Sequence, residues 1–144
     1  ETSDFIRETV DFARRVIDRQ IEIEERLSPD VPPLVADRGQ LHQVLVNIIM
    51  NAAEAITGKG RIVIEARKGG GAPEEIAPAG EIPDPHVLIR VTDTGGGMTE
   101  DVLARLFEPF FSTKGTGRGL GMAAVYGIAR QHKALVHAAS VPGE

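Results

Sequence analysis

The segment Gln40–Ile56 constrains the fold of this chain most strongly, because its apolar residues recur at helical spacing. Six of them share one face of the predicted helix: Leu41, Val44, Leu45, Ile48, Ile49 and Ala52. The polar stripe of the same helix carries two asparagines four residues apart, Asn47 and Asn51, between Gln43 and Glu54. The segment therefore predicts a helix with one buried face and one polar face.

Two asparagines on one helix face need an explanation, since Asn is a mediocre helix former whose side chain competes for backbone hydrogen bonds. One explanation is a ligand, because the Asn side-chain oxygen is a hard, neutral donor that suits Mg²⁺ held between protein and phosphates. The other explanation is a hydrogen-bonded polar pair at a helix–helix contact. The segment alone leaves both explanations open.

Length and composition indicate one globular domain spanning residues 1–144. The chain is 42% hydrophobic and 26% charged, with a net charge of -5, and it contains no Cys. The acidic balance argues against nucleic acid as a partner, and the absence of Cys excludes disulfides and thiolate metal sites. No apolar run reaches the ~20 residues of a membrane span, and the N-terminus does not resemble a signal peptide. We expect a cytoplasmic domain cut from a larger protein, whose own membrane attachment stays open.

The order of predicted elements favours an α+β fold. Helices are expected at Asp4–Arg19, Gln40–Ile56, Asp101–Phe107 and Leu120–Gln131, and strands at Ile21–Glu24, Arg61–Arg67, His86–Thr92 and Ala134–Ala139. Residues 69–85 are rich in Gly and Pro and predict a flexible insertion loop. This order indicates a two-layer sandwich in which a mixed sheet is covered on one face by helices.

A first glycine cluster follows the strand His86–Thr92, in the sequence DTGGGM that spans Asp93–Met98. Glycines without Cβ let a ligand approach the main chain closely. A carboxylate at the end of a strand, as at Asp93, can accept a hydrogen bond from an exocyclic amine such as that of adenine. A plain strand-to-helix turn would explain the same residues.

A second glycine cluster, KGTGRGLGMAA at Lys114–Ala124, opens a helix. Its alternate glycines Gly117, Gly119 and Gly121 expose backbone N–H groups at the positive end of that helix, where anions bind. Lys114 and Arg118 add positive charge for phosphate oxygens. A flexible loop that merely starts a helix is the alternative.

The segment LFEPFFSTK at Leu106–Lys114 separates the two clusters. Phe107, Phe110 and Phe111 lie among turn residues, and aromatic side chains on a loop have to be buried or held for a partner. A loop hinged by glycines and docked by aromatic residues predicts a nucleotide lid, which we place at residues 98–117. A loop packed permanently on the core is the simpler interpretation, and the two are compatible.

Taken in order, these segments resemble the catalytic ATP-binding domain of bacterial sensor histidine kinases, within the superfamily of gyrase, heat-shock chaperone and mismatch-repair ATPases. NIIMNAAEA resembles the N box of that family, DTGGGM its first glycine box, LFEPFFSTK its phenylalanine box and GRGLGMAAV its second glycine box. The resemblance covers about Asp4 to Pro142. The family usually adds one more strand after a segment such as SVPGE, where this sequence stops.

The resemblance implies ATP and Mg²⁺ as cofactors, and it implies a role for each matching residue. Asn51 would bind Mg²⁺, Asn47 would assist at the phosphates, Asp93 would accept the adenine amino group, and Lys114 would reach the terminal phosphate. Asn47 and Lys114 are thus the implied catalytic residues. The remaining implied ATP-binding residues are Gly95, Gly97, Met98, Phe107, Gly117, Arg118, Gly119, Leu120 and Gly121. Thr94 stands where the family commonly has Asn, a departure that puts little in doubt.

Asn47 distinguishes a kinase from a hydrolase. Hydrolases of the superfamily carry a Glu one helical turn before the metal-binding Asn, where it acts as the general base on water. Asn47 occupies that position here and cannot take a proton, so autonomous ATP hydrolysis should be weak. The residues after the four histidines are Gln43, Val87, Lys133 and Ala138, whereas an acceptor histidine is normally followed by an acidic residue.

The resemblance therefore implies transfer of the γ-phosphate to a histidine on a separate dimerisation and phosphoacceptor domain, with a response-regulator receiver domain as the later partner. The parent protein would be a homodimer, and the isolated chain would not phosphorylate itself. Two alternatives remain open. One is a serine kinase that regulates sigma factors, built on the same fold, and the other is a degenerate module that only binds nucleotide or acts as a scaffold.

Overall fold

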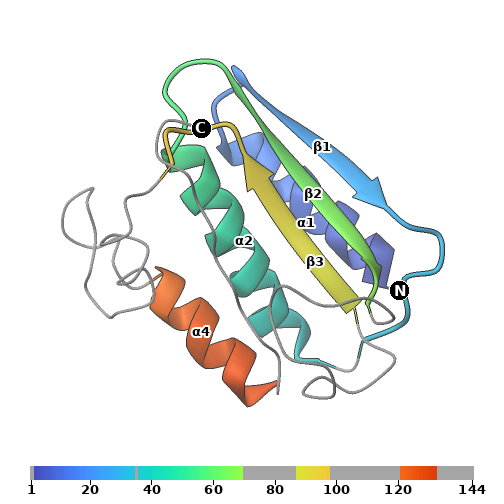
Figure 1. Cartoon of the computed structure of the whole chain (residues 1–144). Coiled ribbons are helices and arrows are strands. Elements are labelled where there is room, and N and C mark those ends of the chain that lie inside the picture. Colours follow the sequence, from blue (N-terminus) through green and yellow to red (C-terminus); the bar gives the residue numbers. More distant parts are fainter. Residues whose placement is uncertain (1, 35, 70–86, 98–120, 133–144) are drawn as a thin grey trace.

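The computed structural model describes residues 2–34, 36–69, 87–97 and 121–132, and it shows helices packed against one face of a small sheet (Figure 1). The elements follow in the order α1 (Thr2–Val16), β1 (Ile21–Leu27), α2 (Arg38–Glu54), β2 (Gly60–Lys68), β3 (Val87–Asp93) and α4 (Gly121–Gln131). Across these ranges no helix is long and apolar enough to cross a membrane.

The three strands form a mixed sheet in the order β1-β2-β3. Strand β1 runs parallel to β2, with Ile23 beside Ile62, and β2 runs antiparallel to β3, with Ile64 beside Val91. A parallel pair needs a long crossover connection, and the segment containing α2 supplies it. Because side chains alternate along a strand, this register turns these four apolar residues toward the helices.

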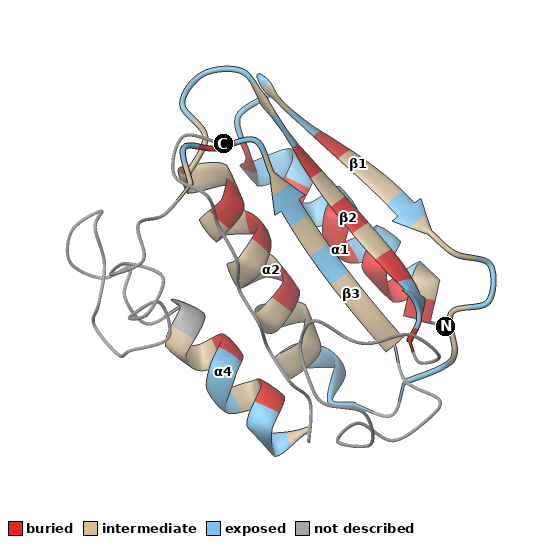
Figure 2. Ribbon diagram, in the orientation of Figure 1, coloured by how far each residue is buried: buried red, intermediate tan, exposed pale blue. Residues whose placement is uncertain are grey.

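The core lies between this face of the sheet and helices α1 and α2, whose buried residues face one another (Figure 2). Ile6 of α1, Ile49 of α2, and Ile62 and Ile64 of β2 have no exposed surface. Complete burial of one such side chain stabilises the fold by ~1.5–3 kcal/mol. The predicted apolar face of the asparagine helix is therefore confirmed, with Ile49 at its centre.

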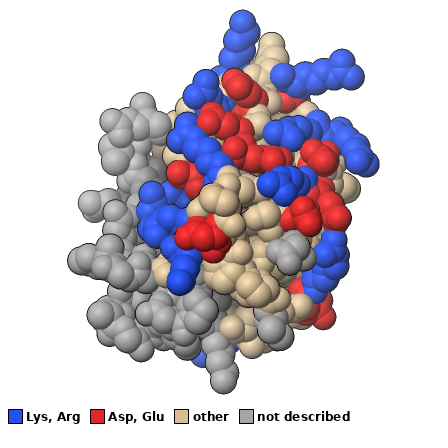
Figure 3. Space-filling view, turned by 90° about the vertical axis from the view of Figure 1, so that its right-hand side faces the viewer, with Lys and Arg blue, Asp and Glu red and all other residues tan. Residues whose placement is uncertain are grey.

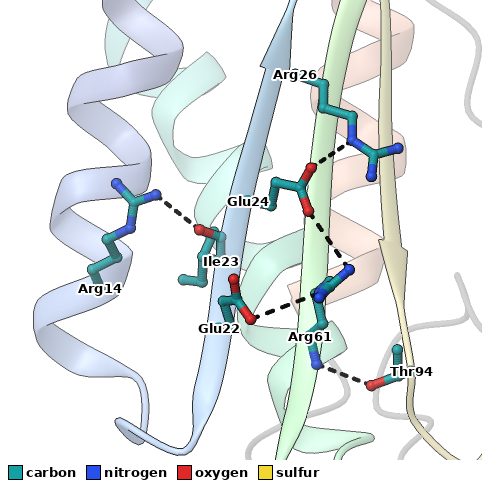
Figure 4. Close-up of polar contacts among 7 residues, drawn as sticks. All are labelled: Arg14, Glu22, Ile23, Glu24, Arg26, Arg61 and Thr94. Carbon is teal, nitrogen blue, oxygen red and sulfur yellow. Dashed lines mark hydrogen bonds and ion pairs between the residues drawn. The ribbon is translucent and has the colours of Figure 1, made fainter.

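Polar contacts add to this packing where α1 meets its neighbours. The Arg14 guanidinium donates a hydrogen bond to the backbone carbonyl of Ile23 at 2.8 Å, which joins α1 to β1 (Figure 4). At the start of α2, the Arg38 guanidinium lies 5.1 Å from the centre of the Phe5 ring and also pairs with Glu8. Helix α1 is thereby fixed against both β1 and α2.

Helix α2 begins at an N-cap that its sequence encodes locally. The Asp37 carboxylate accepts a hydrogen bond from the backbone N–H of Gln40 at 2.9 Å, which satisfies one of the free donors of the first turn. At the other end, the N–H of Ala55 donates to the carbonyls of Asn51 and Ala52. The helix therefore ends one turn beyond Asn51.

Within the described residues, the opposite face of the sheet carries charged side chains and no helix packs on it. Arg61 of β2 lies 3.8 Å from both Glu22 and Glu24 of β1, and Arg26 lies 2.7 Å from Glu24 (Figure 4). The hydrogen bond from Arg26 lowers the pKa of the Glu24 carboxyl, and the same contact raises the pKa of Arg26. Figure 3 shows basic and acidic side chains interspersed over one side of the molecule.

The predicted α+β architecture, with a mixed sheet covered on one face by helices, is confirmed. The first helix ends at Val16 rather than Arg19, because Asp18 forms a turn in which its carboxylate accepts from the N–H of Gln20 at 2.8 Å. Strand β1 continues past Glu24 to Leu27 in register with β2. The predicted helix 101–107, the strand 134–139, residues 70–85 of the insertion loop and any closing strand lie outside the described residues.

Candidate functional site

Asn47 and Asn51 lie on the face of α2 that turns toward α4. The Gln40 side chain donates to the Gln131 side-chain oxygen at 3.4 Å, which marks this face of α2. Asn47 and Asn51 follow Gln40 by seven and eleven residues, or about two and three helical turns, so they continue the same stripe. Both side chains are half-buried, whereas Leu45 on the other side of α2 is in the core.

Helix α4 runs antiparallel to α2 and begins beside the second asparagine. Its last residue, Gln131, contacts Gln40 near the start of α2. Gly121 lies ten residues before Gln131, and Asn51 lies eleven residues after Gln40. At ~1.5 Å per residue these spans are about 15 and 17 Å, so the N-terminus of α4 comes about level with Asn51. Figure 1 shows α2 and α4 side by side.

A histidine at the end of α4 holds this arrangement. The Nε2 atom of His132 lies 3.2 Å from the backbone N–H of Asp37, the N-cap of α2, and Nδ1 lies 2.9 Å from the carbonyl of Ile128. The carbonyl can only accept and the amide can only donate, so Nδ1 carries the proton and Nε2 accepts. His132 therefore joins the C-terminus of α4 to the start of α2.

The loop after β3 docks on the opposite end of α2. Asp93 is half-buried and faces the helical layer, since its register partner Ile62 is buried. The N–H of Gly95 donates to the Asp93 carboxylate at 2.8 Å, and the N–H of Gly96 donates to the carbonyl of Ala55 at 3.2 Å. Because Ala55 lies one turn beyond Asn51, the Asp93 loop lies close to the same part of α2.

Two glycines of this loop are required by its geometry. A Cβ atom added to Gly95 would lie 2.6 Å from the backbone oxygen of Ala55, so only glycine lets the loop approach the end of α2 this closely. Gly97 has a φ of 76°, a backbone conformation that other residues rarely adopt. The glycine requirement inferred for the first cluster is thus explained here by packing against α2 and by backbone conformation.

Thr94 has a structural role that the sequence analysis missed. Its hydroxyl oxygen accepts from the backbone N–H of Arg61 at 3.0 Å (Figure 4). Its own N–H donates to the carbonyl of Arg61 at 3.1 Å. These two bonds hold the start of the loop to the beginning of β2. A Ser or Thr after a strand is too common to have signalled this contact, which depends on the register of β2 and β3.

Three elements therefore converge on one side of α2: its own asparagine stripe, the N-terminus of α4 and the Asp93 loop. Residues 36–144 match the model of the "Histidine kinase-, DNA gyrase B-, and HSP90-like ATPase" family. The chain belongs to this ATPase family.

Curated relatives of this ATPase-family chain are bacterial sensor kinases. It is 37% identical over 133 residues to the sensor kinase CckA of Brucella abortus, which covers 90% of this chain and 14% of that protein. It is 39% identical over 120 residues to the sensory histidine kinase/phosphatase NtrB of Rhizobium meliloti, covering 82% of this chain and 31% of that protein. The chain thus spans less than a third of the length of either relative.

Solved structures support the same family. The catalytic domain of histidine kinase ThkA, in a nucleotide-free form, superposes with a TM-score of 0.70 at 26% identity, covering 90% of this chain and 77% of that one. Full-length ShkA, solved in complex with AMPPNP, superposes with a TM-score of 0.69 at 30% identity, covering 90% of this chain and 25% of that one. The fold of this family member is therefore that of histidine kinase catalytic domains.

The structure describes part of the predicted ATP-binding set. Asn47, Asn51, Asp93, Gly95 and Gly97 lie around the convergence, and Gly121 is the first residue of α4. The other predicted residues, which belong to the lid and the second glycine cluster, lie outside the described part of the chain: Met98, Phe107, Lys114, Gly117, Arg118, Gly119 and Leu120.

Both described histidines of this ATPase-family chain are engaged in structural contacts. His132 uses both ring nitrogens in the contacts given above. The Nδ1 atom of His42 lies 3.3 Å from the Thr9 hydroxyl, and its ring packs edge-on against Phe12 at 5.4 Å. Both rings are thus held by neighbouring residues, while His86 and His137 lie outside the described ranges.

The donor set around α2 fits a magnesium ion that is held largely by phosphates. No group of three or more His, Cys, Asp or Glu side chains suited to a metal occurs in the described ranges, so these residues alone form no carboxylate cage. Mg²⁺ commonly keeps few protein ligands and binds through the phosphates of its nucleotide. The half-buried side chain of Asn51 carries a neutral amide oxygen, a donor type that suits such an ion.

Two surface hollows among the described residues lie elsewhere. One groove of about 400 Å³ is on the charged face of the sheet, and a second of about 220 Å³ lies between the end of α1 and α2. Neither is lined by Asn47, Asn51 or Asp93. The candidate site is therefore defined by converging elements, since the predicted lid that would form its other wall is outside the described part.

Proposed function

We propose that this chain binds Mg-ATP and donates the γ-phosphate to a histidine on a separate dimerisation and phosphoacceptor domain of the same parent protein. The observation that supports this proposal best is the convergence on α2 of the asparagine stripe, the α4 N-terminus and the Asp93 loop. Membership of the ATPase family and the names of the relatives, which are sensor kinases, agree with it.

The phosphate end of the nucleotide belongs beside Asn51 in this proposal. The free N–H groups of the first turn of α4 and the positive end of its dipole favour an anion there. Asn51 faces the same space from α2 and would hold the magnesium ion, with Asn47 one turn below it assisting at the phosphates. The bound magnesium would neutralise the phosphate charge, which is a large part of catalysis in phosphoryl transfer.

The adenine end belongs at the Asp93 loop. The Asp93 carboxylate already accepts one hydrogen bond, from the Gly95 N–H, and a carboxylate can accept several. It can therefore also accept from the exocyclic amine of adenine without losing the loop contact. The backbone of Gly95 to Gly97 would form the pocket wall, because glycine leaves room for a planar ring beside the main chain.

Transfer to a protein rather than to water follows from Asn47. An amide cannot take a proton from water, so the site lacks the general base that a hydrolase needs at this position. Within the described ranges, neither histidine is placed as an acceptor. We therefore place the acceptor on another domain, with a response-regulator receiver as the later recipient and a homodimeric parent that brings the domains together.

The experiment that tests this proposal combines binding with transfer. Calorimetry with Mg-ADP should detect binding to the chain, and radiolabelled ATP should leave the isolated chain unlabelled. Adding the acceptor domain of the parent protein should give label on that domain, stable to alkali and lost in acid, as expected of phosphohistidine. Label on the isolated chain would contradict the transfer half of the proposal.

Two other outcomes would replace the proposal. Acid-stable phosphoserine on a partner protein would identify the regulatory serine kinase of sigma-factor pathways. A chain that shows neither heat of binding nor a thermal shift with nucleotide would be a scaffolding module. All of these measurements use the wild-type chain, so the three functions are distinguished without making variants.

A further inference from the structure

A row of charged side chains crosses the open face of the sheet near the ends of β1 and β2. The register places Arg26 of β1 beside Glu65 of β2, and Glu65 beside Arg90 of β3. These three residues point away from the helices, because Glu65 lies between the buried residues Ile64 and Ala66, and Arg26 and Arg90 are its register partners on the same face. The row therefore has the charge order basic, acidic, basic on the face that no described helix covers.

A groove follows this row. It has a volume of about 400 Å³ and is lined by Arg26, Leu27, Ser28, Glu65, Ala66, Arg67, Leu88 and Arg90. Three arginines and one glutamate give it a local charge of +2 (three minus one), although the chain as a whole carries -5. The groove is thus a basic site on an acidic protein.

The contacts of these arginines leave most of their donors available. Arg26 donates to Glu24 through Nε, and Arg67 donates to the carbonyl of Lys68 at 3.2 Å. Within the described part of the chain, Arg90 has no ion-pair partner within 4.0 Å. A guanidinium has five N–H donors, so all three side chains can bind further carboxylates.

The central glutamate decides which anion fits. Neighbouring strands lie ~4.8 Å apart, so Arg26 and Arg90 are about 10 Å apart at their backbones, with Glu65 between them. A compact dianion placed midway would meet the Glu65 carboxylate and be repelled. An extended peptide can place one carboxylate on each side of Glu65 and donate a backbone N–H to it. Leu88 offers an apolar contact beside Arg67.

We propose that this groove binds an acidic peptide segment in extended conformation, with separate carboxylates on Arg26 and on Arg90, one on each side of Glu65, a further carboxylate on Arg67, and a backbone N–H on Glu65. The partner is a protein segment with alternating acidic and apolar residues. This surface lies on the opposite face of the sheet from α2, so its occupation is independent of the proposed nucleotide site.

The test is fluorescence anisotropy of a labelled peptide of alternating Glu and Val, titrated with the whole chain. The double variant R67E/R90E should weaken binding by about tenfold or more, since two attractive ion pairs become repulsive contacts. The matched control is R15E/R19E, which makes the same change in net charge at two exposed arginines of another surface and should retain affinity within about twofold. Circular dichroism melting curves verify that both variants are folded.

Several outcomes would overturn the proposal. One is a wild-type chain that does not bind the peptide, and another is equal loss of affinity in the two double variants, which would show only a net-charge effect. A third is displacement of the peptide by inorganic phosphate at equal concentration, which would identify a site for compact anions. Specific loss in R67E/R90E, resistant to phosphate and weakened by salt, would support it.

Discussion

At the scale of single residues, two adjacent glycines of the Asp93 loop have different surroundings. A Cβ on Gly95 would meet the carbonyl of Ala55 at 2.6 Å, whereas a Cβ on Gly96 would meet nothing within 4 Å. Neither residue has a positive φ, so the difference between them is one of space alone. Alanine substitutions at the two positions therefore test how closely the loop packs against α2.

We expect Gly95→Ala to destabilise the chain by about 1–3 kcal/mol, because backbone would have to move to accommodate the methyl group. Gly96→Ala is the matched control and should change stability by less than about 0.5 kcal/mol. Urea unfolding followed by circular dichroism measures both values. Equal stabilities of the two variants would contradict the docked position of the loop.

Asn51→Ala tests the proposed metal ligand. The loss of one charge-assisted contact to Mg-nucleotide should weaken Mg-ADP binding by at least about tenfold, with little effect in EDTA. Calorimetry with and without magnesium measures the difference. The substitution should not unfold α2, because Ala is a better helix former than Asn. A variant with the magnesium-dependent affinity of the wild type would remove Asn51 from the proposed role.

At the scale of elements, the position of α4 depends on contacts at its C-terminal end. His132 bonds the N-cap of α2 across 95 positions of sequence, and Gln131 reaches Gln40 across 91. These contacts orient the whole helix, so they also place its distant N-terminus beside Asn51. Residues far from the proposed phosphate position thereby determine where it lies.

His132→Ala should therefore lower stability by about 1–2 kcal/mol, the contribution of two hydrogen bonds of which one joins separate helices. It should also weaken nucleotide binding, because α4 would no longer be held level with Asn51. Gln131→Ala removes only a contact of 3.4 Å and should cost less than about 0.5 kcal/mol. Thermal unfolding and calorimetry on both variants make the comparison. Unchanged nucleotide affinity in the His132 variant would show that α4 is held by other contacts.

Most helices and strands could be predicted from local pattern, because each carries its own signal. The apolar stripe around Ile49 and the alternation of Ile62 and Ile64 are such signals, and the described elements follow them. The end of α1 was predicted less well, since a turn at Asp18 competes with helical periodicity there. Thr94 was treated as neutral because its partner, Arg61, is 33 residues away.

At the scale of the whole molecule, the two faces of the sheet have opposite character. One is buried under α1 and α2, and the other carries ion pairs between Arg61 of β2 and Glu22 and Glu24 of β1, and between Glu24 and Arg26 within β1. Such exposed pairs contribute little to stability individually, and salt screens them. They make this face of the sheet a charged surface, and the proposed nucleotide site lies on the opposite face, where the helices pack.

Glu24 predicts a small pH dependence of stability. The Arg26 hydrogen bond lowers its pKa in the folded chain, so this contribution is present above the unfolded pKa and is lost as the pH falls through the folded value. Glu24→Gln should therefore reduce the stability difference between neutral and acidic pH in low salt. Urea unfolding at several pH values tests this, and added salt should abolish the difference between variant and wild type. An identical pH profile in low salt would contradict the effect.

The sequence alone determined the residue chemistry of this chain and its family resemblance, because glycine clusters, caps and apolar periodicity are local properties of the polypeptide. It predicted the asparagine helix, which taken alone left the role of Asn47 and Asn51 open between ligand and helix contact, and the family resemblance then implied magnesium binding by Asn51. Only the tertiary structure placed that stripe along α4, docked the Asp93 loop on Ala55 and formed the arginine groove across three strands. These arrangements depend on strand register and on contacts between distant residues, which no local pattern encodes.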